Sequence, residues 1–138
     1  MGLYNVFQIA GSAMSAQSVR LNTVSSNLAN VDSVSGTPEG AYHARQPVFA
    51  AVLQATRGDQ AAVGVKVEAI VEDQTEPPRE YQPGNPLADA DGYVYRSNVN
   101  PVQEMANMIS ASRSYQNSVE VLNTSRQLLL KTLTLGQR

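Results

Sequence analysis

The single histidine of the chain, His43, is the first residue to consider for catalysis or metal binding. It follows Tyr42 in a stretch without helical or strand periodicity, and the sequence has no cysteine and no second histidine. Catalytic and metal sites both need several converging side chains. We therefore expect His43 to have a structural role, and a small hydrolase built on it is the least favoured class of function.

Carboxylates are the second group that could do chemistry, because eight of the twelve lie in the middle of the chain. A general acid–base pair requires one carboxyl group to be buried so that its pKa rises. These carboxylates stand instead among polar and proline-rich neighbours, which favours a hydrated surface. The eight are Asp59, Glu68, Glu72, Asp73, Glu76, Glu80, Asp89 and Asp91.

The segment Asp89-Ala90-Asp91-Gly92 has the composition of the opening of a calcium loop. Its glycine is at the fourth position and not the sixth, and the twelfth residue is Asn100, where such loops have glutamate. A tight turn explains the segment better. With no glycine-rich phosphate loop and only single arginines, we expect no enzyme activity, no metal, no cofactor and no small-molecule substrate.

The composition limits the remaining classes of protein. The 138 residues fit one domain, and charged residues make up 16%, against about 25% in typical soluble domains. A net charge of −2 argues against binding to nucleic acid or anionic membranes. No window approaches the roughly 20 apolar residues of a membrane span, and a cleaved secretory signal is not expected. The absence of cysteine suits an oxidising compartment, although chance explains it equally well.

A heptad pattern near the N-terminus predicts a long helix. The stripe consists of Phe7, Ala10, Met14, Gln17, Leu21, Val24, Leu28 and Val31. Alternating steps of three and four residues are typical of a coiled-coil seam. Its other faces are polar but almost uncharged, with Arg20 the one charged residue before residue 32. Because serine, threonine and asparagine are poor helix formers, this helix should be marginal in isolation.

The C-terminal segment shows the same pattern. Its stripe consists of Met105, Met108, Ser112, Tyr115, Val119, Leu122, Arg126, Leu129 and Leu133. Asn100 is a suitable N-cap before Pro101, and Gly136 is a suitable stop. Glu104 in the first turn and Lys131 near the end suit the helix dipole.

The two helices are predicted to pair as an antiparallel coiled coil, in a mainly α fold with a small β region. An intramolecular seam is expected from Phe7, Met14, Leu21, Val24, Leu28, Met105, Met108, Val119, Leu122, Leu129 and Leu133. Contacts between subunits are expected from Asn27, Asn30, Ser112 and Gln116. The uncharged outer faces favour packing against other copies, and we expect the terminal segments to fold fully only on assembly. A soluble helical-hairpin adaptor with one partner is the alternative.

Between the helices, residues 35–98 are predicted to form a small β-rich and irregular unit. Residues 64–72 alternate, with Val65, Val67, Ala69 and Val71 on one face and Ile70 as the exception on the other. A preceding strand is expected at residues 46–53, with a connecting loop at 56–62. Asp91-Gly92 predicts a tight turn before a strand at residues 93–95. The prolines of residues 76–86 exclude a regular element there.

Several motifs carry a family resemblance that runs essentially from end to end. The segment Ser26-Asn27-Leu28-Ala29-Asn30-Val31-Asp32 resembles the signature that flagellar rod and hook proteins share. Within that family, residues 84–94 and 110–116 resemble the proximal rod proteins. The excursion Ser35–Gly40 is longer than is usual in the family, so no contacts are transferred there.

The resemblance implies a structural axial subunit of the bacterial flagellar basal body. Such a subunit would be exported unfolded by the flagellar type III apparatus without signal cleavage and would polymerise helically in the periplasmic rod. Residues 1–34 and 99–138 would line the inner tube, and residues 35–98 would face outward. Copies of itself, other rod proteins and the membrane-proximal adaptor would be its partners. Another member of the rod and hook family remains an alternative.

Overall fold

The computed structural model describes residues 3–54 and 62–136. Two long helices, α1 (Leu3–Ala29) and α2 (Pro101–Gly136), are the first and last elements along the chain. The five strands between them are β1 (Val34–Ser35), β2 (Arg45–Gln54), β3 (Ala62–Glu72), β4 (Arg79–Tyr81) and β5 (Tyr93–Arg96). The predicted class, mainly α with a small antiparallel β region, is confirmed. The expectation of no regular element at residues 76–86 is wrong, because Arg79–Tyr81 between the prolines pair with β5 as a short strand.

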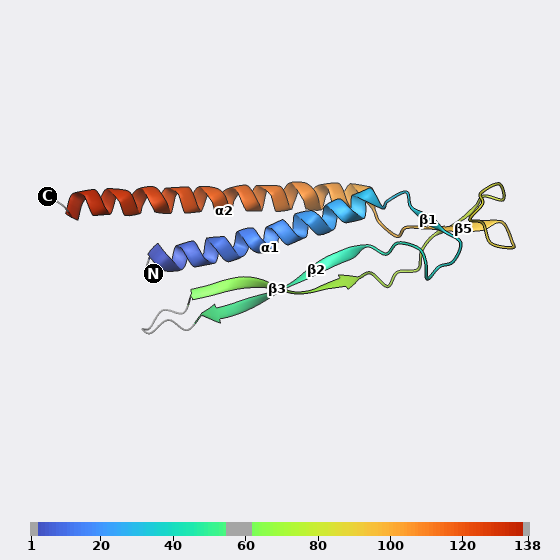
Figure 1. Cartoon of the computed structure of the whole chain (residues 1–138), viewed down its shortest axis with the longest axis horizontal. Coiled ribbons are helices and arrows are strands. Elements are labelled where there is room, and N and C mark those ends of the chain that lie inside the picture. The colour runs from blue at the N-terminus through green and yellow to red at the C-terminus, as the bar shows by residue number, and fades with distance from the viewer. Residues whose placement is uncertain (1–2, 55–61, 137–138) are drawn as a thin grey trace.

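The elements form an elongated arrangement with α1 in the middle (Figure 1). On one side α1 packs antiparallel to α2, and on the other it packs against the β2–β3 hairpin. A second small sheet, with the strand order β1-β5-β4, lies at the end of the molecule where α1 ends and α2 begins. The C-terminal turns of α2 extend past the start of α1 (Figure 1).

The start of α2 follows the local sequence signals. The side-chain oxygen of Asn100 accepts hydrogen bonds from the backbone N–H of Val102 at 3.1 Å and of Gln103 at 3.2 Å. Asn100 is therefore the N-cap, and Pro101 occupies the first turn, where a missing N–H costs nothing. The described part of α2 runs to Gly136. The predicted start is confirmed, and the predicted stop at Gly136 stays a prediction.

The β2–β3 hairpin is longer than predicted and is irregular at one point. Val48 pairs with Ala69 but Phe49 pairs with Val67, so Glu68 is an additional residue in β3. Such a bulge reverses the alternation of side chains along the strand. The predicted single face of Val65, Val67, Ala69 and Val71 is therefore wrong. Ile70, the exception in the pattern, lines a cavity against α1.

The loop expected at residues 56–62 lies almost wholly outside the described residues, since only Ala62 is described, as the first residue of β3. That prediction therefore stays a prediction.

The turn before β5 is as predicted, and it explains the residues that resembled a calcium loop. Gly92 has a φ of +82°, a conformation that L side chains rarely adopt. The carboxylate of Asp89 accepts hydrogen bonds from the backbone N–H of Asp91 at 3.0 Å and of Tyr93 at 2.8 Å. Asp89 therefore organises this turn from within. The rings of Tyr81 and Tyr93 lie 5.2 Å apart beside it.

The buried core of the described residues is small and contains few large side chains. Its apolar members are Ala10, Ala16, Ala41, Ala44, Val24, Val94, Val99 and Ala111. Among side chains that are almost completely buried, the two largest are Val94 and Asn27. Since alanine contributes little apolar area, hydrophobic burial within one chain stabilises this fold only modestly.

Candidate functional site

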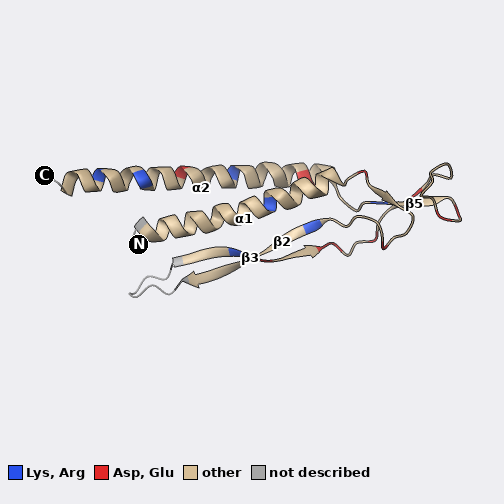
Figure 2. Ribbon diagram, in the orientation of Figure 1, with Lys and Arg blue, Asp and Glu red and all other residues tan. Residues whose placement is uncertain are grey.

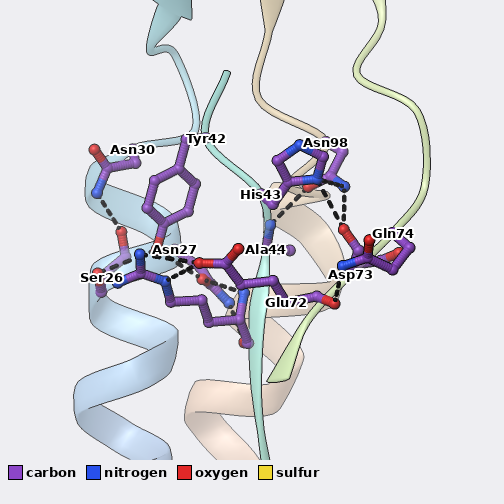
Figure 3. Close-up of polar contacts among 11 residues, drawn as sticks. Ser26, Asn27, Asn30, Tyr42, His43, Ala44, Glu72, Asp73, Gln74 and Asn98 are labelled. Atoms are coloured by element: carbon purple, nitrogen blue, oxygen red, sulfur yellow. Dashed lines mark hydrogen bonds and ion pairs between the residues drawn. The ribbon is translucent and has the colours of Figure 1, made fainter. Parts of the chain in front are cut away.

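Asn27, within the motif at the end of α1, is completely buried and joins three elements. Figure 3 shows it beside Tyr42. Its side-chain Nδ2 donates to the backbone oxygen of Arg45 in β2 and to the Glu104 carboxylate in α2, both at 2.8 Å. Its Oδ1 accepts from the backbone N–H of Arg45 at 2.9 Å and from the Tyr42 hydroxyl at 3.0 Å. All the hydrogen-bonding capacity of this amide is used.

The residues around Asn27 extend this connection, and we call Asn27, Tyr42, Arg45 and Glu104 the asparagine junction. Tyr42 also shares a hydrogen bond of 3.1 Å with the Ser26 hydroxyl of α1. Glu104 is 5% exposed, and its second carboxylate oxygen accepts from Asn107 of α2 at 3.1 Å. The predicted first-turn role of Glu104 is therefore incomplete, because its carboxylate is a buried acceptor for α1.

A second asparagine, Asn98, holds the segment between β5 and α2 against the rest of the chain (Figure 3). Its Oδ1 accepts from the backbone N–H of Ala44 at 2.6 Å, and its Nδ2 donates to the backbone oxygen of Thr75 at 2.9 Å. His43 lies beside it, with Nδ1 at 2.8 Å from the backbone oxygen of Asp73. His43 thus links two segments, in keeping with the structural role that we expected.

Asp73 is a titratable group whose hydrogen bonds clearly shift its pKa. The Thr75 hydroxyl donates to its carboxylate at 2.6 Å, and the Thr75 backbone N–H donates at 2.8 Å. These hydrogen bonds stabilise the ionised form, so they lower the pKa of Asp73 below its ordinary value. The arrangement caps a turn and presents no acid or base for catalysis.

Charged residues are sparse on the helices and are concentrated in the remaining segments (Figure 2). Arg96 in β5 forms ion pairs with Asp32 at 3.0 Å and with Glu80 at 3.2 Å, and Arg45 pairs with Glu72 at 3.1 Å. All of these pairs are solvent-accessible, so each contributes little to stability. No cluster of three potential metal ligands occurs in the described residues, and no described helix is apolar enough to span a membrane.

Most residues predicted for the helix seam are at least partly buried. Val24 is 3% exposed. The half-buried members are Phe7, Met14, Leu21, Leu28, Met108, Val119, Leu122 and Leu129. The antiparallel pairing of the helices is thus accompanied by burial along much of both predicted stripes.

Met105 and Leu133 require a correction, because they are 55% and 63% exposed. The buried residues of α2 are instead Glu104, Ala111 and Ser125. Small and hydrogen-bonded side chains let α1 approach closely, which turns the larger Met105 to the flank. Leu133 is exposed for a different reason. Asn27 contacts Glu104, and α1 begins 24 residues before Asn27, so the start of α1 lies near Leu128 of the antiparallel α2. Beyond that level α2 has no α1 beside it.

The four predicted subunit contacts divide in a similar way. Asn27 requires a correction, because it is 0% exposed and its partners all belong to its own chain. Asn30 is partly buried, and its Nδ2 donates to the backbone oxygen of Ser26 at 2.8 Å. On α2, Ser112 is partly buried and Gln116 is exposed. Of the four, Gln116 is the one fully available to a neighbouring molecule, with Ser112 at the margin.

Most of the exposed large apolar side chains of the described residues lie on α2 and on the β2–β3 hairpin. On α2 they are Val102, Met105, Ile109, Val121, Leu128, Leu130, Leu133 and Leu135. On the β2–β3 hairpin they are Val48, Phe49, Leu53, Val63, Val65, Ile70 and Val71. Exposed apolar area on this scale in a chain of this size is typical of a surface that other molecules cover.

The comparisons with known proteins agree with this picture. A family model described as "Flagella basal body rod protein" matches residues 7–36, and one described as "Flagellar basal body rod FlgEFG protein C-terminal" matches residues 90–135. The chain is 56% identical to flagellar basal-body rod protein FlgC of Salmonella typhimurium over 99% of its own length and the whole of that protein. It belongs to the FlgC family of flagellar rod proteins.

Further FlgC proteins match over the same extent. The chain is 56% identical to FlgC of Escherichia coli O157:H7 and 45% identical to FlgC of Buchnera aphidicola from Acyrthosiphon pisum, in each case over 99% of this chain and 100% of the relative. The resemblance to the rod proteins is therefore confirmed. FlgC proteins are structural components of the basal body, so the prediction that this chain is not an enzyme is confirmed as well.

The sequence pattern of this FlgC-family chain did not reveal the asparagine junction. Tyr42, Arg45 and Glu104 stand 15, 18 and 77 positions after Asn27 in the sequence, and no local periodicity connects them. One usable signal was Glu104 itself, an acidic residue beside the predicted stripe of a helix that otherwise has few charges. A carboxylate on a buried helix face requires a donor, and a motif asparagine is a suitable one.

Proposed function

We propose that this chain is a structural subunit of the proximal rod of the bacterial flagellar basal body, where it assembles helically with copies of itself and with other rod proteins. The observation that carries the proposal is the apolar surface that one chain leaves uncovered along α2. Val102, Met105 and Ile109 form a row at steps of three and four residues, each more than half exposed. In the rod, neighbouring subunits would cover such a row.

The sparse charge of both helices supports this function. Burying an unpaired charge is costly, whereas uncharged polar and small apolar side chains can be packed against a neighbour. Figure 2 shows how little of α1 and α2 is charged. We further propose that the helix pair is an antiparallel coiled coil, that residues 1–34 and 99–138 form the axial part, and that residues 35–98 face outward.

We also propose the route and the remaining neighbours that follow from this function. The chain would be exported unfolded by the flagellar type III apparatus without signal cleavage and would meet the membrane-proximal adaptor in the periplasmic rod. A core rich in alanine supports passage in an unfolded state, because little apolar burial has to be undone.

The substitution Met105→Glu tests the proposed assembly surface. Met105 is exposed, so this change should alter the free energy of unfolding of the isolated chain by no more than about 0.5 kcal/mol. It should nevertheless reduce incorporation of the chain into basal bodies, because it would bury a charge between subunits. Motility in soft agar and immunoblots of purified basal bodies measure the effect.

Two controls make the result interpretable. Ser110→Glu, on an exposed position of the same helix, controls for an added charge on α2, and Met108→Glu, at a half-buried position, should destabilise the isolated chain itself. Normal incorporation of Met105→Glu would contradict the surface proposed here. A wild-type chain that is absent from basal bodies and binds one soluble partner at fixed stoichiometry would favour the adaptor alternative.

A further inference from the structure

A shallow apolar groove runs between α1 and α2 near the end where α1 begins. Its volume is about 420 Å³. It is lined by Val6, Ile9, Ala10, Ala13, Asn117, Ser118 and Val121, none of which is charged. The side chains from α1 are apolar, and Val121 on its rim is 47% exposed. The groove can therefore accept an uncharged apolar segment.

The same chain carries a segment of this kind, the last turns of α2 from Leu128 to Leu135, which we call the overhang. Leu128, Leu130, Leu133 and Leu135 are between 51% and 75% exposed. Figure 1 shows that the overhang extends past the start of α1. Val121, Leu128 and Leu135 recur at steps of seven, so the row that begins at the groove continues onto the overhang.

The overhang cannot fill the groove of its own chain, because the overhang and the α2 wall of the groove are parts of the same continuous helix. Val121 and Leu135 are separated by 14 residues, or about 21 Å at 1.5 Å per residue. An overhang that fills this groove must therefore belong to another molecule. The overhang of a second copy satisfies the requirement, since it is apolar and continuous with the interface that α1 and α2 already form.

We infer that the overhang of one subunit docks into the α1–α2 groove of a parallel neighbour displaced by two heptads, about 21 Å, along the helix axis. This inference rests on the proposed rod function, which supplies the parallel orientation. Leu135 of one copy then lies at the level of Val121 and Ala10 of the next. Because the groove and the overhang are different surfaces, the contact is heterologous and continues from copy to copy without closing.

Cysteine cross-linking tests the contact directly, since the natural sequence has no cysteine. We would introduce Ile9→Cys and Leu135→Cys into one chain, oxidise assembled basal bodies mildly, and separate the products without reducing agent. Ile9 lines the groove with Val121, and Val121 is 14 residues from Leu135, or about 21 Å, so no disulfide can form within one chain. The expected product is a ladder of dimers, trimers and larger species.

The controls distinguish the inference from the function on which it rests. Each single-cysteine variant should remain monomeric after oxidation, and so should the pair Val102→Cys with Leu135→Cys, which joins two exposed positions at opposite ends of α2. Basal bodies that contain the chain but yield no ladder, or only closed dimers, would overturn the docking and leave the rod function intact. Absence of the wild-type chain from basal bodies would instead overturn the rod function.

Discussion

The side-chain amide of Asn27 donates a 2.8 Å hydrogen bond to the carboxylate of Glu104, across the pair of terminal helices and 77 positions along the chain. Both side chains are buried, at 0% and 5% exposure. The same amide pairs with the backbone of Arg45 in both directions. One residue therefore sets the position of α1 relative to α2 and to the β2–β3 hairpin. In a rod, such a junction would keep every subunit in the same shape.

The substitution Asn27→Asp should destabilise the chain by about 2–4 kcal/mol, because it removes two donors and places a second carboxylate beside Glu104. Urea unfolding followed by circular dichroism, at a chain concentration high enough for both helices to form, measures the loss. Adding Glu104→Gln should restore part of it, since a glutamine amide is uncharged and can donate to the introduced carboxylate. Asn30→Asp is the matched control, because Asn30 is only partly buried and bonds its own helix. Equal losses for the two single substitutions would contradict the junction.

Gly92→Ala and Gly11→Ala should have opposite effects on stability. Gly92 has a φ of +82°, and a Cβ there would lie 2.9 Å from the ring of Tyr81, so we expect a loss of about 1–2 kcal/mol. Gly11 lies in α1 with no atom within 4 Å of an added Cβ, so alanine should add about 0.5–1 kcal/mol through helix propensity. Thermal unfolding of both variants checks the signs, and an undiminished stability of Gly92→Ala would contradict the turn geometry.

A dilute solution of the isolated chain should contain much less helix than α1 and α2 together would give. The apolar core is mostly alanine and valine, and α2 has large apolar side chains that one chain leaves exposed. Far-ultraviolet circular dichroism at increasing concentration should show the helix content rising as copies associate. Two complete helices protected from hydrogen exchange in the lone chain would argue strongly against assembly-coupled folding.

Thr75→Val should raise the pKa of Asp73 toward its ordinary value, because the largest cause of the lowering is the hydrogen bond from the Thr75 hydroxyl. In the wild-type chain the folded pKa is below the unfolded one. The resulting stability is thus fully present above the unfolded pKa and is lost as the pH falls through the folded pKa. A carboxyl-carbon NMR titration measures the pKa in both variants. Thr75→Ser keeps the hydroxyl and should keep the low pKa.

Local patterns predicted the elements well where local physics decides. The Asn100 side chain accepts from the N–H groups of Val102 and Gln103, Pro101 has no N–H to satisfy, and Gly92 supplies the positive φ of its turn. The bulge at Glu68 was not predictable, since it depends on how β2 and β3 pair. The exposure of Met105 was missed for a similar reason: heptad spacing identifies a stripe, but the burial of Glu104 and Ala111 decides its rotation.

By itself the amino-acid sequence determined the two long helices, the antiparallel β region between them, the absence of catalytic groupings and the membership in the rod proteins, because periodicity, capping and motifs are local properties. Only the tertiary structure decided that Asn27 is the centre of the asparagine junction and that α2 extends beyond the start of α1. Both depend on which distant groups meet. A buried asparagine and an exposed one look the same in the sequence. They differ in the partners that folding brings within hydrogen-bonding distance of the side-chain amide.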